Sequence, residues 1–130
     1  MKIEHIALWT QNLESLKTFY ETYFQATASA KYHNQKTHFQ SYFLTFPTGG
    51  ARLEIMYKPT VVPSGRENDA IVSGLAHCAF SVGSRDAVEA LTSQLEHDGF
   101  TIASYPRTTG DGYYESCVLD PDGNLVEITI

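Results

Sequence analysis

The stretch that decides the fold is Ile3-Glu4-His5-Ile6-Ala7, because the same pattern returns later in the chain as Leu75-Ala76-His77-Cys78-Ala79. A second pair closes each half, where Arg52-Leu53-Glu54-Ile55-Met56 is matched by Leu125-Val126-Glu127-Ile128-Thr129. The two histidines stand 72 positions apart (77 − 5) and the two glutamates 73 apart (127 − 54). The sequence therefore predicts a duplicated module that carries one His and one Glu at matched places.

Length and charge narrow the class of protein. A chain of 130 residues has the size of one compact domain with its own core. Its net charge of −6 does not suit a phosphate backbone, so we expect no nucleic-acid partner. No apolar run approaches the ~20 residues that span a bilayer, and charges interrupt the N-terminus where a signal peptide needs its apolar segment. We expect a cytoplasmic protein without a membrane partner, in which Cys78 and Cys117 are reduced thiols.

The order of elements repeats as well. Each half begins with a strand pattern (3–10 and 75–82), followed by a helix whose N-cap is Asn12 or Ser84. Three further strands should follow, near 26–32, 40–46 and 52–57 in the first half, and near 100–105, 114–119 and 125–130 in the second. We predict an α+β fold of two β-α-β-β-β modules (about 1–58 and 74–130), joined by a linker at 59–73 into a single domain, 1–130. Two similar mixed sheets should share a core, with the helices outside.

Alternation along the strands predicts where the repeated residues point. His5 and Glu54 should face away from the first helix, and His77 and Glu127 away from the second. A carboxylate within an apolar strand must be protonated, paired or metal-bound. Arg52 is the local partner for Glu54, and each His could be an ordinary core residue. Four such residues at two matched places favour a shared divalent metal ion.

With these residues, and with Asp120-Pro121-Asp122-Gly123-Asn124 before the last strand, the whole chain resembles the vicinal-oxygen-chelate superfamily. That superfamily includes glyoxalase I (lactoylglutathione lyase), bleomycin-resistance proteins and extradiol dioxygenases. The resemblance implies that the sheets curl into a cup around one metal ion held by His5, Glu54, His77 and Glu127. It also implies a homodimer, with sites often built from two subunits.

Two imidazoles and two carboxylates suit Ni, Co, Zn or Mn and leave room for a substrate with adjacent oxygens. The ion would stabilise an enediolate after proton removal. The resemblance thus implies a metal-dependent lyase or isomerase that acts on the thiohemiacetal of a 2-oxoaldehyde, in the detoxification of methylglyoxal. We expect Glu127 to be the principal base and Glu54 its counterpart.

Further residues are candidates for substrate binding. Trp9 suggests an apolar or aromatic pocket, and Arg52 could hold a carboxylate of a thiol cosubstrate. Arg107, at the start of a glycine-rich run, could anchor an anion. Glu115 is a weaker candidate base, and we match it with Tyr42 in the first half (115 − 73). Because Trp9 stands where glyoxalase I often has an Arg, the identity of the thiol stays open.

Other readings keep the fold but change the chemistry. One is another metal-dependent enzyme of the superfamily, such as an epimerase, a thiol transferase or a dioxygenase. The last two use two His and one Glu, which would leave Glu54 spare, and epimerases commonly have Gln at that position. The other reading is a metal-free protein that binds a drug or small molecule, as in bleomycin resistance. Such proteins tend to lose the ligands, whereas all four are present here.

Overall fold

The computed structural model describes residues 1–63, 71 and 73–130. The chain divides into two compact units, Met1–Ser64 and Gly65–Ile130, and each is described by itself. Part of the predicted linker (64–70 and 72) lies outside the described residues. In the part that is described, no helix is long and apolar enough to cross a membrane.

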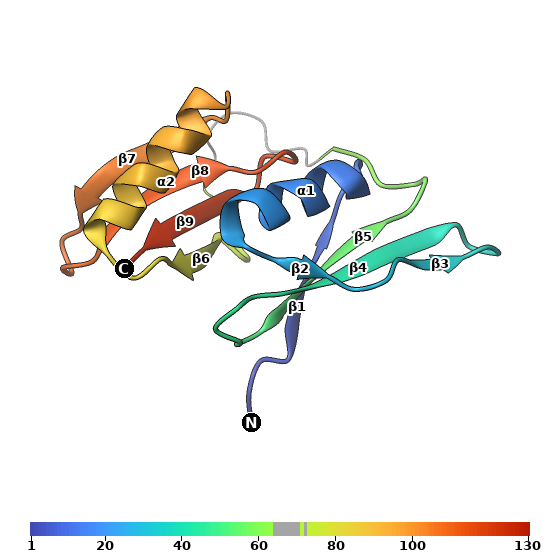
Figure 1. The fold of residues 1–130 in the computed structure, drawn as a ribbon. Helices are drawn as coiled ribbons and strands as arrows, with labels where there is room; N and C mark the ends of the chain where they lie inside the picture. The colour runs from blue at the N-terminus through green and yellow to red at the C-terminus, as the bar shows by residue number, and fades with distance from the viewer. Residues whose placement is uncertain (64–70, 72) are drawn as a thin grey trace. The chain divides into compact units, whose positions relative to one another are not determined.

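The first unit is a mixed sheet with one helix (Figure 1). The sheet order is β1-β5-β4-β2, and β3 also pairs with β4. Strands β1 and β5 are parallel, whereas β4 is antiparallel to its neighbours. The elements are β1 (His5–Trp9), α1 (Leu13–Phe24), β2 (Thr27–Ala28), β3 (Tyr32–Asn34), β4 (Phe39–Thr45) and β5 (Arg52–Tyr57).

The second unit repeats this plan. Its sheet order is β6-β9-β8-β7, with β6 and β9 parallel and the other pairs antiparallel. In Figure 1 the helix α2 lies across one face of this sheet, and it contacts β7, β8 and β9. The elements are β6 (His77–Ser81), α2 (Arg85–His97), β7 (Ile102–Thr108), β8 (Tyr114–Leu119) and β9 (Leu125–Thr129).

Local signals set the helix ends as expected. The Asn12 side chain accepts a hydrogen bond from the Ser15 N–H at 3.0 Å, and Ser84 accepts one from Ala87 at 3.2 Å. These bonds satisfy backbone donors that a first helical turn cannot pair internally. After α2, Gly99 takes a φ of +90°, the left-handed conformation that ends many helices.

Each helix covers one face of its own sheet. The alternate residues of β5 and β9 on that face are fully or nearly buried, and they pack with apolar residues of the helices. Burial of each such side chain contributes roughly 1.5–3 kcal/mol. The opposite face of each sheet is not covered by its helix. The helix-side residues of these two strands are Leu53, Ile55, Val126 and Ile128.

The structure confirms the α+β fold and the two β-α-β-β-β modules. The predicted strand near 26–32 is in fact two short strands, β2 and β3, which pair with different parts of β4. Its counterpart near 100–105 is one longer strand, β7, with two register shifts against β8. The cup remains a prediction, because it depends on how the two units are placed.

Candidate metal-binding site in two halves

The central feature is a His/Glu pair that occurs once in each unit. In the first unit His5 lies opposite Arg52 and Ala7 opposite Glu54. Because side chains two residues apart share a face, His5 and Glu54 project from adjacent parallel strands on the same side. In the second unit Ala79 lies opposite Glu127, so His77 and Glu127 have the same offset.

The two pairs have closely similar geometry. His5 Nε2 lies 3.8 Å from Glu54 Oε2, and His77 Nε2 lies 3.4 Å from Glu127 Oε2. Both imidazoles are 40% exposed, while the carboxylates are 16% and 15% exposed. Each unit therefore presents one nitrogen and one carboxylate oxygen together, on the sheet face away from its helix.

The environment of Glu127 favours its protonated form. Burial raises the pKa of this carboxyl, the Glu115 carboxylate and a hydrogen bond to it raise the pKa further, and the His77 imidazole partly lowers it. A raised pKa makes a carboxylate a stronger base, which suits the role expected for Glu127.

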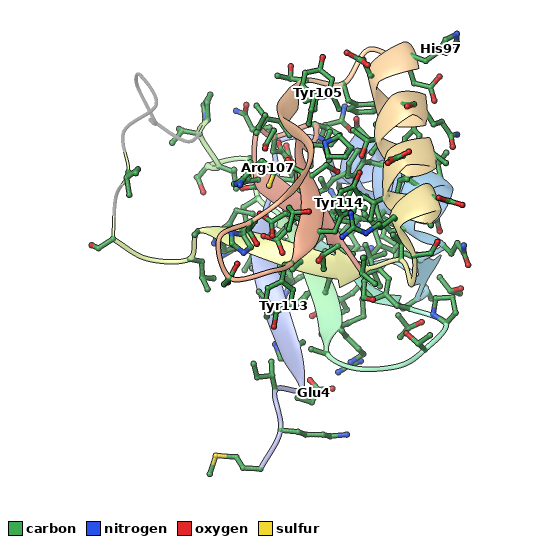
Figure 2. The ribbon with its side chains drawn as sticks, turned by 90° about the vertical axis from the view of Figure 1, so that its left-hand side faces the viewer. Glu4, His97, Tyr105, Arg107, Tyr113 and Tyr114 are labelled. Atoms are coloured by element: carbon green, nitrogen blue, oxygen red, sulfur yellow. The ribbon has the colours of Figure 1, made fainter. Side chains whose placement is uncertain are left out.

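A second layer of contacts surrounds His5. Its Nδ1 lies 2.5 Å from Oε2 of Glu4, which lies just before β1 (Figure 2). Arg52 does not stay free for a ligand, because its guanidinium binds the other oxygen of Glu4 and stacks over the Phe43 ring at 4.2 Å. The Phe43 ring in turn meets the His5 ring edge-on, with centroids 5.5 Å apart.

Aromatic rings occupy the other end of the same sheet face. Trp9 meets Phe39 edge-on at 6.1 Å, and Tyr32 lies 6.0 Å from Phe39. The Lys58 ammonium lies 5.7 Å from the Trp9 ring centroid. Trp9 and Tyr32 are about half exposed. These four residues, which we call the aromatic patch, make this end of the first unit apolar, with one positive charge.

The second unit surrounds its pair with polar groups instead. Cys117 lies opposite Glu127, and Glu115 opposite Thr129. Arg107 reaches Glu115 at 3.6 Å and donates a hydrogen bond from Nε to Ser104. Burial, together with the Glu127 and Glu115 carboxylates, raises the pKa of the Cys117 thiol, so it stays a neutral thiol near pH 7.

The match between Glu115 and Tyr42 is wrong. Tyr42 is buried on the helix side, where its hydroxyl donates to Glu14 of α1 at 3.0 Å. The ladders place Ser41 opposite Met56 and Glu115 opposite Thr129, so Ser41 is the true counterpart (115 − 41 = 74). On the helix side of β8, the Tyr114 hydroxyl instead donates to Glu89 of α2 at 2.7 Å (Figure 2).

Several site neighbours were missed from the sequence. Phe43 and Cys117 occupy the same ladder position, each opposite the Glu of the His/Glu pair in its unit, and counting alternate residues along β4 and β8 could have found them. Glu4 could not be found in this way, because it precedes the strand and a regular alternation would turn it away from His5.

The atoms of each pair are of a kind that binds divalent ions. Imidazole nitrogen and carboxylate oxygen are ligands for borderline transition metals. Among the described residues, no group of three or more His, Cys, Asp or Glu side chains is arranged to hold a metal ion. Each pair by itself offers one imidazole nitrogen and one carboxylate oxygen.

Sequence comparison places this chain in a family. Residues 2–128 match the Glyoxalase/Bleomycin resistance protein/Dioxygenase superfamily. The chain belongs to this superfamily. No curated protein matches the sequence significantly.

Solved structures share the fold at low identity. A glyoxalase family protein from Enterococcus faecalis is 24% identical with a TM-score of 0.79, over 99% of this chain and 97% of that one. Glyoxalase I from Zea mays is 20% identical with a TM-score of 0.79, and the match covers 98% of this chain but 44% of the maize chain. The trypanothione-dependent glyoxalase I of Leishmania major is 18% identical with a TM-score of 0.76, over 99% and 86% of the two chains. These likenesses establish the fold.

Proposed function

We propose that this protein is a metal-dependent lyase of the glyoxalase type, which isomerises the thiohemiacetal of a 2-oxoaldehyde such as methylglyoxal. The observation that carries the proposal is the His/Glu pair, present in both units with the same ladder offset and the same exposure. A single pair is a weak ligand set, whereas two give two nitrogens and two carboxylates.

In this proposal His5, Glu54, His77 and Glu127 hold one Ni, Co, Zn or Mn ion. The two pairs meet either within one chain or across a homodimer. When bound, the ion supplies Lewis-acid stabilisation of two adjacent substrate oxygens. Two imidazoles are neutral ligands and two carboxylates balance a double positive charge.

The protein's own residues handle the proton. Glu127 takes the proton from the substrate carbon and returns it to the neighbouring carbon, because its carboxylate is partly buried and made more basic by Glu115. Glu54 is the counterpart base of the first unit. Glu54 lies opposite Phe43, whereas Glu127 lies opposite Cys117. The two carboxylates therefore need not contribute equally to proton transfer.

Substrate binding is assigned to the residues around the pairs. Arg107 holds an anionic group of the substrate, and Trp9 packs against an apolar part of it. Glu115 is the remaining acidic candidate, already paired with Arg107. Arg52 is a poorer candidate than the sequence indicated, because Glu4 and Phe43 engage its guanidinium.

The aromatic patch favours a second candidate function. A site for the charged ends of glutathione needs cationic side chains, whereas Trp9, Phe39 and Tyr32 form an apolar surface. Another metal-dependent reaction of the superfamily (epimerisation, thiol transfer or dioxygenation), on a substrate with an aromatic part, is the alternative. Metal-free binding of a drug-like molecule is a further one.

The deciding experiment combines metal analysis and a thioester assay. Purified protein is analysed for bound metal, then supplied with methylglyoxal and a series of thiols. Metal together with thioester product is the expected result. Metal without thioester supports the second candidate, and protein that neither binds metal nor loses stability on chelation supports metal-free binding.

A further inference from the structure

We propose that Glu4 is a positioning residue for His5, held in place by Arg52, and that it directs the Nε2 lone pair of His5 toward Glu54 and the metal. This inference rests on the proposed function for its role in metal binding. Nothing in the superfamily match assigns Glu4.

The contacts form a chain of three groups. One carboxylate oxygen of Glu4 lies 2.5 Å from His5 Nδ1, and the other accepts from the Arg52 guanidinium. A carboxylate only accepts hydrogen bonds, so the proton between Glu4 and a neutral His5 ring belongs to Nδ1. The lone pair of that ring is then on Nε2, the atom that lies 3.8 Å from Glu54 Oε2.

Arg52 keeps Glu4 in this position. Its guanidinium is fixed from one side by the Phe43 ring at 4.2 Å, and Phe43 also contacts the His5 ring. Arg52 lies directly opposite His5 in the β1–β5 ladder, so it is placed to hold a carboxylate that turns back over the strand end. Carboxylates that bind the second nitrogen of a ligand histidine fix its tautomer and ring orientation.

Among the described residues of the second unit, the positions that match Glu4 and Arg52 cannot make the equivalent contacts. Ala76 precedes His77, and Leu125 lies opposite it. Neither side chain can accept a hydrogen bond or carry a charge. The two ligand histidines therefore differ in support although they match in position.

The first test needs no metal. Long-range ¹⁵N–¹H NMR spectra of the apoprotein, taken at a pH where the rings are neutral, report which nitrogen of each His carries the proton. His5 should be in the Nδ1–H form in the wild type and lose this preference in Glu4→Ala. Glu4→Gln, whose amide oxygen still accepts a hydrogen bond, should keep part of it. A His5 tautomer unchanged in Glu4→Ala would overturn the inference whatever the protein binds.

The second test measures Co²⁺ binding by absorption spectroscopy and chelator competition. Glu4→Ala should weaken binding about 10–100-fold, the usual effect of losing such a partner. The matched control is Glu21→Ala, which removes a partly exposed carboxylate paired with Lys17 on α1 and should leave the affinity unchanged. Equal Co²⁺ affinity in the wild type and Glu4→Ala would contradict the inference about Glu4 but not the proposed function. If His5→Ala did not reduce Co²⁺ binding, the proposed function would be contradicted as well.

Discussion

The two units present the same ligand pair in opposite surroundings. Around His5 and Glu54 the first unit has aromatic rings and an Arg–Glu pair, whereas around His77 and Glu127 the second has a thiol, a second carboxylate and Arg107. The backbone ladder that sets the pair is the same in both. The difference teaches that the repeated framework fixes the His/Glu pair, whereas the residues around each pair have diverged.

The largest expected effect is on kcat, and it should differ between variants of Glu127 and Glu54. If Glu127 is the principal base, Glu127→Gln should lower kcat for thioester formation by about 10²–10⁴-fold, the usual contribution of a general base. Glu54→Gln should lower kcat less, because in the proposed mechanism Glu54 serves mainly as a metal ligand. Metal content, measured alongside, separates loss of the ion from loss of the base. Full turnover in Glu127→Gln with its metal retained would rule out this assignment.

Metal stoichiometry tests whether the two pairs share an ion. His5→Ala and His77→Ala should each weaken binding by at least the ~10–100-fold seen for outer partners, with one ion per His5/His77 set in the wild type. Isothermal titration with Co²⁺ measures both quantities. Two independent sites would instead appear as two ions, one of them lost in each variant.

Stability should differ between the two hairpin turns. Asp120 is 4% exposed and accepts hydrogen bonds from Asp122 N–H at 3.0 Å and from Asn124 N–H at 2.8 Å. Asp120→Ala should lower the free energy of unfolding by about 1.5–3 kcal/mol, as for bonds to a charged group, in urea denaturation. The matched position in the first unit is Phe46 (120 − 74), because Gly49 N–H donates to its carbonyl as Gly123 N–H donates to that of Asp120, and the exposed Pro47 follows it. Pro47→Ala should change stability by only about 0.5 kcal/mol; equal losses would contradict this.

The smallest expected effect is on the pH dependence of the free energy of unfolding. A carboxyl whose pKa is higher in the folded protein than in the unfolded chain stabilises the fold below the unfolded pKa, and this contribution is lost as the pH rises through the folded pKa. Glu127 is such a group, in part because of Glu115. Glu115→Gln should lower the pKa of Glu127. As the pH rises from 4 to 7, the variant apoprotein should therefore lose less stability than the wild-type apoprotein, and the difference should be less than ~1 kcal/mol.

Carboxyl ¹³C NMR and urea titrations at several pH values measure this effect. Glu21→Gln on α1 is the control. The first unit has Ser41 in the place of Glu115. Ser41→Ala should therefore leave the pH dependence of the free energy of unfolding unchanged. An unchanged pKa of Glu127 in Glu115→Gln would contradict the expectation.

The sequence could predict whatever depends on local periodicity. The helix caps at Asn12 and Ser84, the strand positions and the helix-side burial of Leu53 and Val126 follow from spacing alone. The match of Glu115 with Tyr42 failed because the offset between the halves grows along the sheet. It is 72 for the histidines, 73 for the glutamates and 74 for Phe43 and Cys117 (117 − 43).

Contacts that depend on chain ends and side-chain rotamers were beyond the sequence. Glu4 contacts both His5 and Arg52, and Arg52 is 48 residues away in the sequence. Arg52 looked like a partner for Glu54 or a substrate carboxylate, since nothing in the sequence shows that Phe43 and Glu4 engage it. The same holds for the aromatic patch, which joins β1, β3, β4 and the residue after β5.

The parallel pairing of β1 with β5 and of β6 with β9 has a practical consequence for protein engineering. Backbone hydrogen bonds, rather than neighbouring side chains, set the spacing of each His and Glu. Positions 9, 39 and 56 in one half, and 81, 115 and 129 in the other, can therefore be randomised together as a combinatorial library. Such a library would sample new specificities while every member keeps the same spacing of His and Glu in both halves.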